Sequence, residues 1–286
     1  MEESNSLRDQ NIAILGLGLM GASIAMGLRG HCKTILGSDI DSLVCQLAEA
    51  KGIVDSASTD LREILPQADI LILATPVSTA LEIISTLPSI HNGGKLIVTD
   101  VTSTKEQIMH ALESLPSNFD VIGGHPICGK EKLGICNAEK EMLYDATYTL
   151  TPAERTSPRT KSLLTQLVEA IGGNPLWIDA VKHDQMLAKT SHAPHLLAVA
   201  LMHATETDLS KLKAGGFSSA TRLSATPTSM MLSMVMTNAE NTIAALEAVK
   251  SEIDKILTLM KNDDEKNLAI LLDASKAKRE EMMRRV

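Results

Sequence analysis

Aromatic residues are scarce in this chain of 286 residues, in which one Trp, two Tyr and two Phe make up 2% of the sequence. The hydrophobic share is nevertheless 44%, and fourteen residues are Met. The core must therefore be built from Leu, Ile, Val, Ala and Met, and the flexible thioether side chains make it adaptable. A chain of this length is long enough for one large domain or two smaller ones.

Basic residues are outnumbered, with 27 Lys and Arg against 35 Asp and Glu and a formal net charge of −8. Binding to nucleic acid or to an anionic membrane needs basic surface patches, so this balance argues against both kinds of partner. It leaves room for an anionic small-molecule substrate, because a few local cations suffice to hold one.

Cysteine pairs at metal or redox spacing are missing as well. The chain has no C-x-x-C motif, and its four cysteines are Cys32, Cys45, Cys128 and Cys136. We interpret them as free thiols in a reducing compartment, and we expect a cytoplasmic protein.

One segment, Ile12–Leu28, contains no charged residue and in this respect resembles a signal peptide or a membrane span. Its glycines fit a membrane helix poorly, and Glu2, Glu3 and Asp9 precede it where a signal peptide carries basic residues. A buried strand, turn and helix explain the run better, so we expect no membrane partner.

Short apolar runs alternate with helical patterns over the first 179 residues. We expect strands at 11–15, 34–39, 70–74, 95–99, 121–123, 148–150 and 175–178. The helices expected between them cover 19–29, 42–51, 60–65, 78–86, 103–115 and 161–171, with Asp41 as the N-cap of the second. Strands separated by helices are typical of a parallel sheet covered on both faces. The sequence therefore predicts an α/β fold with a Rossmann-type doubly wound sheet.

The strand signals stop beyond Asp179. Helical patterns then cover residues 181–209, 229–260 and 265–284. We therefore expect two domains, residues 1–179 and residues 180–286, of which the second is all-helical. Three helices rich in Leu and Met need a partner surface to bury their apolar faces, so we expect this domain to form a homodimer.

A G-x-G-x-x-G pattern follows the first expected strand and opens the next helix. Gly16 permits the tight turn, Gly18 lets the backbone approach a pyrophosphate, and Gly21 allows close packing of helix on strand. The phosphates would lie at the helix N-terminus formed by Leu19 and Met20, where backbone N–H groups attract anions. The alternative is a glycine turn in an α/β protein that binds no nucleotide.

Asp39 ends the second expected strand, about twenty residues beyond the glycine turn. Its carboxylate can accept hydrogen bonds from ribose hydroxyls and would repel a 2′-phosphate, and no Lys or Arg follows it directly. The pattern predicts NAD rather than NADP as the cofactor. Thr75 and Pro76 follow another strand and should lie beside the same cofactor, because ligands bind at the carboxyl ends of such strands.

His125 lies in a Gly-Gly-His-Pro segment, which we interpret as a glycine-flanked turn at the functional edge of the sheet. A neutral imidazole there can accept a proton from a substrate hydroxyl during hydride transfer. Ser103 is the nearest candidate to orient the ring. The alternatives are a surface histidine at position 125 and a simple helix N-cap at position 103.

His192 and His195 stand three residues apart on one face of an expected helix. A zinc pair and two core histidines both fit that spacing, but no Glu completes an H-E-x-x-H motif and no Cys lies at ligand spacing, so we expect no metal. Arg222 follows a glycine-rich segment and is either an exposed cation or a clamp for a carboxylate.

Five segments occur in order along nearly the whole chain. They are the glycine turn at 16–21, Asp-Val-Thr-Ser-Thr-Lys at 100–105, Gly-Gly-His-Pro-Ile at 123–127, Ser-His-Ala-Pro-His at 191–195, and Gly-Gly-Phe at 215–217 with Thr221-Arg222. Together they resemble the prephenate and arogenate dehydrogenase family of tyrosine biosynthesis. The resemblance implies an NAD-dependent oxidative decarboxylation that aromatises the cyclohexadiene ring of the substrate.

The resemblance also implies roles for individual residues. The family's Gly-His-Pro histidine falls on His125, which would accept the proton of the ring hydroxyl. Its serine falls on Ser103, which would hold that hydroxyl. Its arginine falls on Arg222, which would bind the side-chain carboxylate, and His195 would lie near the same end of the substrate.

Three further residues are expected at the substrate. Ser191 and His192 belong to the matched motif, and Lys130 stands where many relatives have Thr. The chain also lacks the tryptophan that many relatives carry after the arginine. Because His195 is retained, the resemblance favours prephenate over arogenate as the substrate.

Two other interpretations stay open. A β-hydroxyacid dehydrogenase with a helical second half would use a catalytic lysine, for which Lys189 is available, but the Gly-His-Pro motif would then be unexplained. A non-catalytic NAD-binding protein would be expected to lack the histidine at position 125, which is present.

Overall fold

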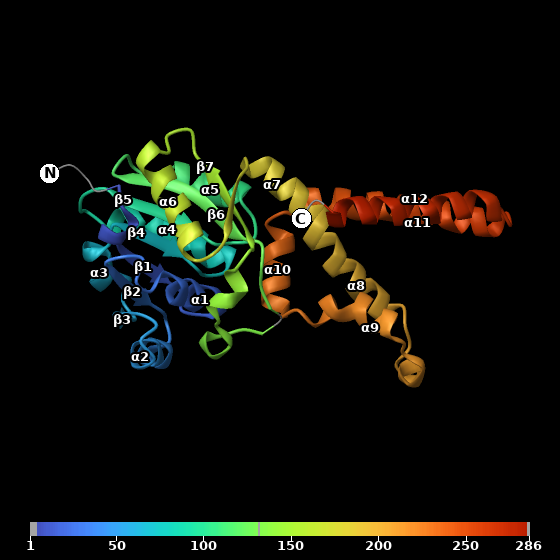
Figure 1. Cartoon of the computed structure of the whole chain (residues 1–286), viewed down its shortest axis with the longest axis horizontal. Helices are drawn as coiled ribbons and strands as arrows, with labels where there is room; N and C mark the ends of the chain where they lie inside the picture. The colour runs from blue at the N-terminus through green and yellow to red at the C-terminus, as the bar shows by residue number, and fades with distance from the viewer. Residues whose placement is uncertain (1–4, 131, 285–286) are drawn as a thin grey trace. The chain divides into compact units, whose positions relative to one another are not determined.

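The computed structural model describes residues 5–130 and 132–284 (Figure 1). The chain divides after Ala239 into two compact units. The first contains one β-sheet and the helices as far as α10, and the second contains most of α11 together with α12.

One sheet of eight strands forms the centre of the first unit, in the order β3-β2-β1-β4-β5-β6-β7-β8. The strands are β1 (Asn11–Leu15), β2 (Thr34–Ser38), β3 (Ser56–Ser58), β4 (Ile70–Leu73), β5 (Leu96–Asp100), β6 (Phe119–Pro126), β7 (Thr147–Pro152) and β8 (Asn174–Trp177). The predicted Rossmann-type sheet is confirmed. From β1 the chain adds β2 and β3 on one side and then returns to add β4 and β5 on the other side. Sheets of this kind bind ligands at the carboxyl ends of the strands where this reversal occurs.

The sheet departs from an all-parallel arrangement at one pair, because β7 runs antiparallel to β6. The described residues between these two strands, 127–130 and 132–146, form loops and short 3-10 helices, and a parallel pairing would need a full crossover. The strand β3 was not predicted, since its sequence Ser-Ala-Ser contains no apolar run.

Helices cover both faces of the sheet. They are α1 (Leu19–Leu28), α2 (Ser42–Ala50), α3 (Leu61–Ile64), α4 (Val77–Ile90), α5 (Glu106–Glu113) and α6 (Pro158–Ala170). Short 3-10 helices lie at Leu7–Asp9, Leu65–Gln67, Ile135–Asn137, Lys140–Leu143, Thr207–Leu212 and Arg222–Ala225. The predicted N-cap of α2 is confirmed, because the Asp41 side chain accepts a hydrogen bond from the Leu43 N–H.

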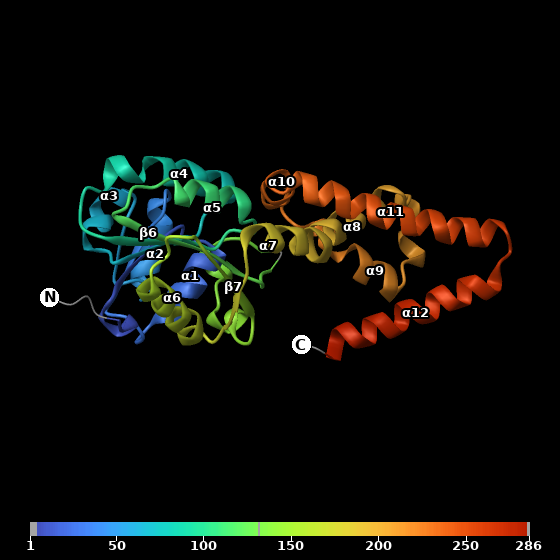
Figure 2. The same cartoon turned by 90° about the horizontal axis from the view of Figure 1, so that it is seen from above.

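Two hydrophobic cores result from the alternation of side chains along the strands. In β1, Ile12 and Ile14 belong to the core that α1 and α6 cover, whereas Ala13 and Leu15 belong to the core that α4 and α5 cover. Figure 2 shows these two pairs of helices on opposite sides of the sheet. All four of these β1 residues are buried.

The helical part of the first unit follows β8. Its helices are α7 (Ala180–Leu187), α8 (Ala193–His203), α9 (Gly215–Thr221) and α10 (Thr228–Met236). The prediction of one uninterrupted helix over 181–209 is wrong, because a π-helical turn at Ala188–His192 separates α7 from α8. Pro194 follows this turn and has no N–H to donate, so it interrupts the α-helical hydrogen bonds there.

The second unit consists of long helices. The prediction of one helix over 229–260 is wrong, because α10 ends at Met236 and α11 (Ala239–Lys261) is a separate helix, followed by α12 (Glu265–Arg284). Large apolar side chains are exposed on both long helices in the single chain: Ile243, Ile253, Leu257, Met260, Ile270, Leu272, Met282 and Met283. Within residues 5–130 and 132–284, no helix is long and apolar enough to cross a membrane.

The glycine turn leads to a first prediction about stability. A Cβ atom added at Gly21 would lie 1.9 Å from the carbonyl oxygen of Gly16, whereas one added at Gly18 would meet no atom within 4 Å. Gly21→Ala should therefore cost about 1–3 kcal/mol of stability and lower the thermal unfolding midpoint. Gly18→Ala is the matched control and should change stability by less than about 0.5 kcal/mol. Equal midpoints for the two variants would contradict this packing argument.

Candidate active site

The carboxyl ends of β1 and β2 hold an acidic side chain against the glycine turn. The Leu17 N–H donates to Oδ2 of Asp39 at 2.8 Å, and the Asp41 N–H donates to Oδ1 at 3.0 Å. The Gly16 N–H donates to the Ser38 carbonyl at 2.8 Å. Each carboxylate oxygen of Asp39 therefore accepts one backbone hydrogen bond and keeps capacity for another.

The turn itself is shaped for a close ligand. Gly16 has φ of +93°, and a Cβ atom there would lie 2.5 Å from the Ala74 carbonyl and 3.1 Å from the Thr75 methyl group. Thr75 thus lies beside the glycine turn, and Pro76 after it is the N-cap of α4. Gly18 is the N-cap of α1, no side chain caps that helix, and the space at Gly18 is open. The exposed N–H groups of the first turn at Leu19 fit an anionic group such as a pyrophosphate.

A buried ion pair fixes the end of β5. Asp100 and Lys105 are both fully buried, and the Lys105 ammonium pairs with Oδ2 of Asp100. The same carboxylate accepts from the Thr102 N–H at 2.9 Å and from the Gly124 N–H at 3.1 Å. Burial lowers the pKa of Lys105, and the charge of Asp100 acts against that shift. The pair ties β5 to the residue immediately before His125.

His125 lies within β6, paired with Thr149 of β7, so its prediction as part of a turn is wrong. The antiparallel β7 extends β6 beyond the three residues that the apolar pattern marked. The ring is partly exposed, and its Nδ1 lies 3.0 Å from Nε2 of His183. His183 in turn places its Nδ1 at 2.7 Å from Oδ1 of Asp184.

Asp184 also caps a helix that lies far from it in sequence. Its Oδ1 accepts from the Lys105 N–H at 2.7 Å, and its Oδ2 accepts from the Glu106 N–H at 2.9 Å. The predicted start of that helix at Ser103 is wrong, because α5 begins at Glu106 and the cap comes from α7. Ser103 is partly exposed, and no hydrogen bond of its hydroxyl occurs among the residues that the structure describes.

The Ser-His-Ala-Pro-His motif lies at the junction of the π-helical turn and α8. His192 is buried, with its Nδ1 at 3.2 Å from the amide nitrogen of Asn238, and that amide donates to the Asp184 carbonyl at 2.8 Å. Burial lowers the pKa of His192 to about 4. His195 is partly exposed, and its Nδ1 donates to the Ser191 carbonyl at 2.8 Å. This fixed bond leaves Nε2 of His195 without a proton in the neutral ring.

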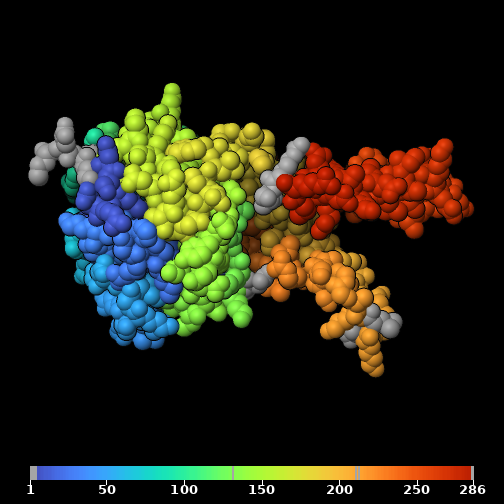
Figure 3. Space-filling view, viewed as in Figure 1, coloured from blue at the N-terminus to red at the C-terminus, as the bar shows by residue number. Residues whose placement is uncertain are grey.

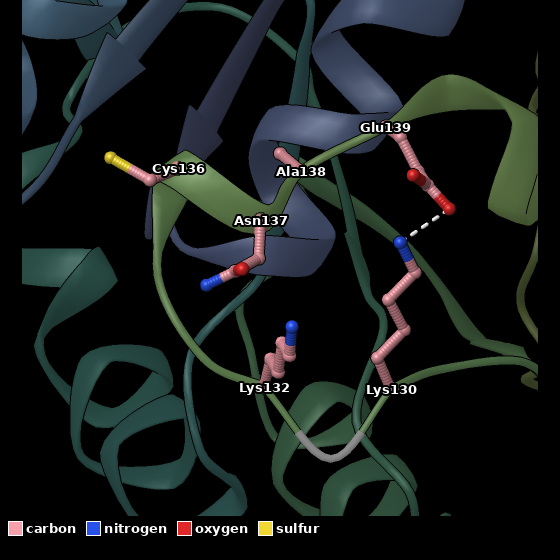
Figure 4. A pocket seen from close by; sticks show the side chains of 6 residues that line it. All are labelled: Lys130, Lys132, Cys136, Asn137, Ala138 and Glu139. Atoms are coloured by element: carbon pink, nitrogen blue, oxygen red, sulfur yellow. Dashed lines mark ion pairs between the residues drawn. The ribbon is translucent and has the colours of Figure 1, made fainter.

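Arg222 and Lys130 belong to two other segments of the first unit. Arg222 is exposed and begins the 3-10 helix Arg222–Ala225, which packs on α8. Lys130 pairs with Glu139, whose N–H donates to the hydroxyl of Ser23 in α1 at 3.0 Å. Figure 4 shows the two side chains extended toward one another.

The Lys130–Glu139 pair lies at the edge of an open cavity of about 340 Å³, which is also lined by Lys132, Cys136, Asn137 and Ala138. The 3-10 helices at Ile135–Asn137 and Lys140–Leu143 contact α1. In Figure 3 this green segment lies against the blue N-terminal part of the chain. In the structure, Lys130 contacts the segment beside α1. The family resemblance had placed Lys130 at the substrate only because it follows the Gly-His-Pro motif.

Electrostatics favour a neutral ring at the centre of the site. Burial is the largest cause that holds the pKa of His125 well below its usual value of 6.5, and the nearby His183, Lys105 and His192 act in the same direction. A neutral imidazole can accept a proton at the nitrogen that is not already bonded to hydrogen. In the part of the chain that the structure describes, no three His, Cys, Asp or Glu side chains are grouped as metal ligands would be.

Three residues of this cluster were missed by sequence reasoning. His183 and Asp184 are the two buried residues of α7, and Asn238 is buried between α10 and α11. An adjacent His-Asp pair on the inner face of a helix is a signal that a search for buried polar residues would have found.

Comparison with known proteins agrees with this geometry. Two family descriptions match the chain: "Prephenate dehydrogenase, nucleotide-binding domain" over residues 24–176, and "Prephenate dehydrogenase, dimerization domain" over residues 179–274. The chain is 35% identical to a prephenate dehydrogenase of Lactococcus lactis over 267 residues, which are 90% of this chain and 73% of the relative.

Two solved structures are similar over nearly the whole chain. One is prephenate dehydrogenase from A. aeolicus in complex with hydroxyphenyl propionate and NAD+, with a TM-score of 0.89, 30% identity, and coverage of 97% of this chain and 99% of the other. The second is arogenate dehydrogenase from Synechocystis, with a TM-score of 0.80, 30% identity, and coverage of 95% and 99%. The chain therefore belongs to the prephenate dehydrogenase family.

Proposed function

We propose that this protein catalyses the NAD-dependent oxidative decarboxylation of prephenate to 4-hydroxyphenylpyruvate, CO2 and NADH, as a step of tyrosine biosynthesis. The observation that carries the proposal is the neutral His125, held through Nδ1 by His183 at the carboxyl end of the sheet. The similar A. aeolicus enzyme binds NAD+ together with hydroxyphenyl propionate, a compound with a ring hydroxyl and a carboxylate.

The glycine turn and Asp39 fit the cofactor. We assign the pyrophosphate to the first-turn N–H groups of α1 near Leu19 and Met20, over the open space at Gly18. Asp39 would accept from the adenine-side ribose with the lone pairs that its two backbone bonds leave. Ile40 follows Asp39 and is 97% exposed, so its apolar side chain is available to cover the adenine.

His125 supplies the proton transfer. NAD, when bound, accepts the hydride released from ring carbon C4. As that hydride leaves, Nε2 of His125 accepts the proton of the C4 hydroxyl. The ring carboxylate then departs as CO2, the electron pair of the broken C–C bond completes the aromatic ring, and the phenol oxygen regains a proton.

The substrate's negative groups are assigned to residues of the helical part. Arg222 would bind the side-chain carboxylate, since a guanidinium can hold a carboxylate through two hydrogen bonds. His195 would lie near the same end, with Ser191 contributing a polar contact. Lys130, from the segment after β6 rather than from the helical part, would contribute a further polar contact to the substrate. Ser103 would hold the ring hydroxyl beside His125. His192 is buried, and we assign it to support of this helix rather than to direct contact.

We also infer the organisation of the whole enzyme. The domain division at residues 1–179 and 180–286 is supported by the two family matches, and the name of the second match supports a homodimer. Dimerisation would cover the exposed apolar side chains of α11 and α12. The four cysteines are free, which supports a cytoplasmic location.

A paired substrate assay tests the proposed function. The purified protein, given NAD, should form NADH and release CO2 with prephenate as substrate. Arogenate is the comparison substrate, because the similar Synechocystis enzyme is an arogenate dehydrogenase. Faster turnover of arogenate than of prephenate would contradict the substrate assignment, and absence of turnover with both would contradict the proposed reaction.

The pH dependence of kcat/KM tests the role of His125. The ring must be unprotonated to accept a proton, and its pKa lies well below 6.5, so activity should be lost only when the pH falls through that lowered value. The value of kcat/KM should therefore show no fall on the acidic side of the profile near pH 7. His125→Asn should reduce kcat by about 10²- to 10⁴-fold while NAD still binds. A limb centred near 6.5, or an unchanged kcat in the variant, would remove the assigned role.

Cofactor choice depends on the charge of Asp39. Asp39→Asn can still accept a hydrogen bond from the Leu17 N–H but no longer repels a 2′-phosphate. The ratio of kcat/KM for NAD over NADP should fall by about tenfold or more, since removal of one such repulsion is worth about 1.4 kcal/mol. Asp41→Asn is the control, because the Asp41 side chain caps α2, whereas its backbone N–H, which the substitution keeps, donates to Asp39. An unchanged ratio in Asp39→Asn would refute the assignment.

A further inference from the structure

We propose that His183 and Asp184 are positioning residues that fix the tautomer of His125, so that Nδ1 of His125 carries hydrogen and Nε2 presents its lone pair to the substrate hydroxyl. The inference rests on the proposed function, in which His125 accepts that hydroxyl proton. It assigns a further role to two residues that do not themselves contact the reacting atoms.

Asp184 is the fixed end of this chain of hydrogen bonds, because both of its carboxylate oxygens are acceptors. Oδ1 accepts from the Lys105 N–H and Oδ2 from the Glu106 N–H, at the N-terminus of α5. Both oxygens are thus held as hydrogen-bond acceptors at the N-terminus of the helix. An ionised carboxylate has no hydrogen to donate, so the bond between Oδ1 and Nδ1 of His183 must use a hydrogen on the histidine.

The direction of the next hydrogen bond follows. A neutral imidazole with hydrogen on Nδ1 has a lone pair on Nε2. Nε2 of His183 faces Nδ1 of His125 at 3.0 Å, so His125 must be the donor. Its own Nε2 is then the acceptor nitrogen. No hydrogen bond to that nitrogen occurs within residues 5–130 and 132–284, and the ring is partly exposed, which leaves Nε2 accessible to a substrate.

Burial protects the directions of these two hydrogen bonds. The side chains of His183 and Asp184 are 0% and 1% exposed, so water cannot compete for either bond. Asn238 holds the backbone of α7 by donating to the Asp184 carbonyl, and Asp100 holds the backbone of β6 by accepting from the Gly124 N–H. The two sides of the histidine pair are therefore anchored separately.

The same chain of bonds stabilises the protonated state. When Nε2 of His125 takes the hydroxyl proton, the new imidazolium still donates from Nδ1 to His183, and His183 donates to the Asp184 carboxylate. A buried carboxylate that orients a histidine and stabilises its imidazolium acts in this way in the Ser-His-Asp triad. Here a second histidine stands between the carboxylate and the base.

Asp184→Leu is the decisive variant. Leu has a similar shape to Asp but accepts no hydrogen bond, so nothing holds the hydrogen of His183 on Nδ1. His183 can then donate from Nε2 to His125, and a His125 that accepts this bond carries its hydrogen on Nε2, where it cannot accept a proton. We expect kcat to fall by about tenfold or more with little change in KM or in NAD affinity.

Nitrogen NMR reads the tautomer without any substrate. In the full-length protein labelled with 15N-histidine, the His125 signals are identified by their absence in His125→Asn. The wild type should show His125 protonated at Nδ1, and Asp184→Leu should show His125 protonated partly or wholly at Nε2. Protonation at Nε2 in the wild type, or the same tautomer in both proteins, overturns the inference. Because no turnover is measured, this result is independent of whether prephenate proves to be the substrate.

Two controls separate positioning from folding. Asp120→Leu makes the same chemical change at the other end of β6, where Asp120 accepts from Thr160 and from the Ser157 N–H, and it should leave kcat and the tautomer unchanged. His183→Gln keeps an acceptor oxygen for Nδ1 of His125, whereas His183→Leu removes it. The Gln variant should retain at least tenfold more kcat than the Leu variant, and equal losses in the two would contradict the inference.

Discussion

The carboxylate of Asp184 is the contact on which the site depends, because it joins three parts of the first unit at one point. It caps α5 through the N–H groups of Lys105 and Glu106, and it accepts from His183, which holds His125. A helix N-terminus is a fixed arrangement of donors, so the position of the carboxylate is set by backbone atoms rather than by flexible side chains. The bonds from α5 through Asp184 and His183 therefore fix the position of His125 relative to the sheet, at whose edge we propose that the cofactor binds.

Buried charge at the end of β5 supports this arrangement from the other side. Asp100 and Lys105 are both fully buried, which would be costly for either alone, and the pair is tolerated because the carboxylate is also bonded to Thr102 and to the Gly124 N–H. One consequence is electrostatic. Burial is the largest cause of the low pKa of His125, and His183, the ammonium of Lys105 and His192 act in the same direction. The residues that hold the strand thus also keep the base neutral.

Local patterns in the sequence were sufficient for every strand of the sheet except β3. They were also sufficient for the glycine turn, because β1, α1 and Asp39 lie within about thirty residues and their contacts follow from known spacing. The Rossmann-type fold and the family were predicted correctly on that basis. The conformation at His125 was not, since β6 is extended by pairing with β7, which no pattern in 121–123 reveals. The cap of α5 and the partner of His125 come from α7, 78 and 58 residues away in sequence, and only the folded chain brings them together. The roles of Ser103, Arg222, His195 and Lys130 stay predictions.

Asp39 and Asp184 show the same physical solution at the two ends of the proposed reaction. Each carboxylate first binds two backbone N–H groups, Leu17 and Asp41 in one case and Lys105 and Glu106 in the other. Each then has acceptor capacity left for a functional group, the cofactor's ribose or the ring of His183. A charge held by backbone amides needs little reorganisation when its partner arrives or when charge develops nearby, and such preorganisation is a main source of catalytic power. Each carboxylate therefore has two roles. It holds the backbone N–H groups in place, and it binds the functional group, either the ribose of the cofactor or the ring of His183.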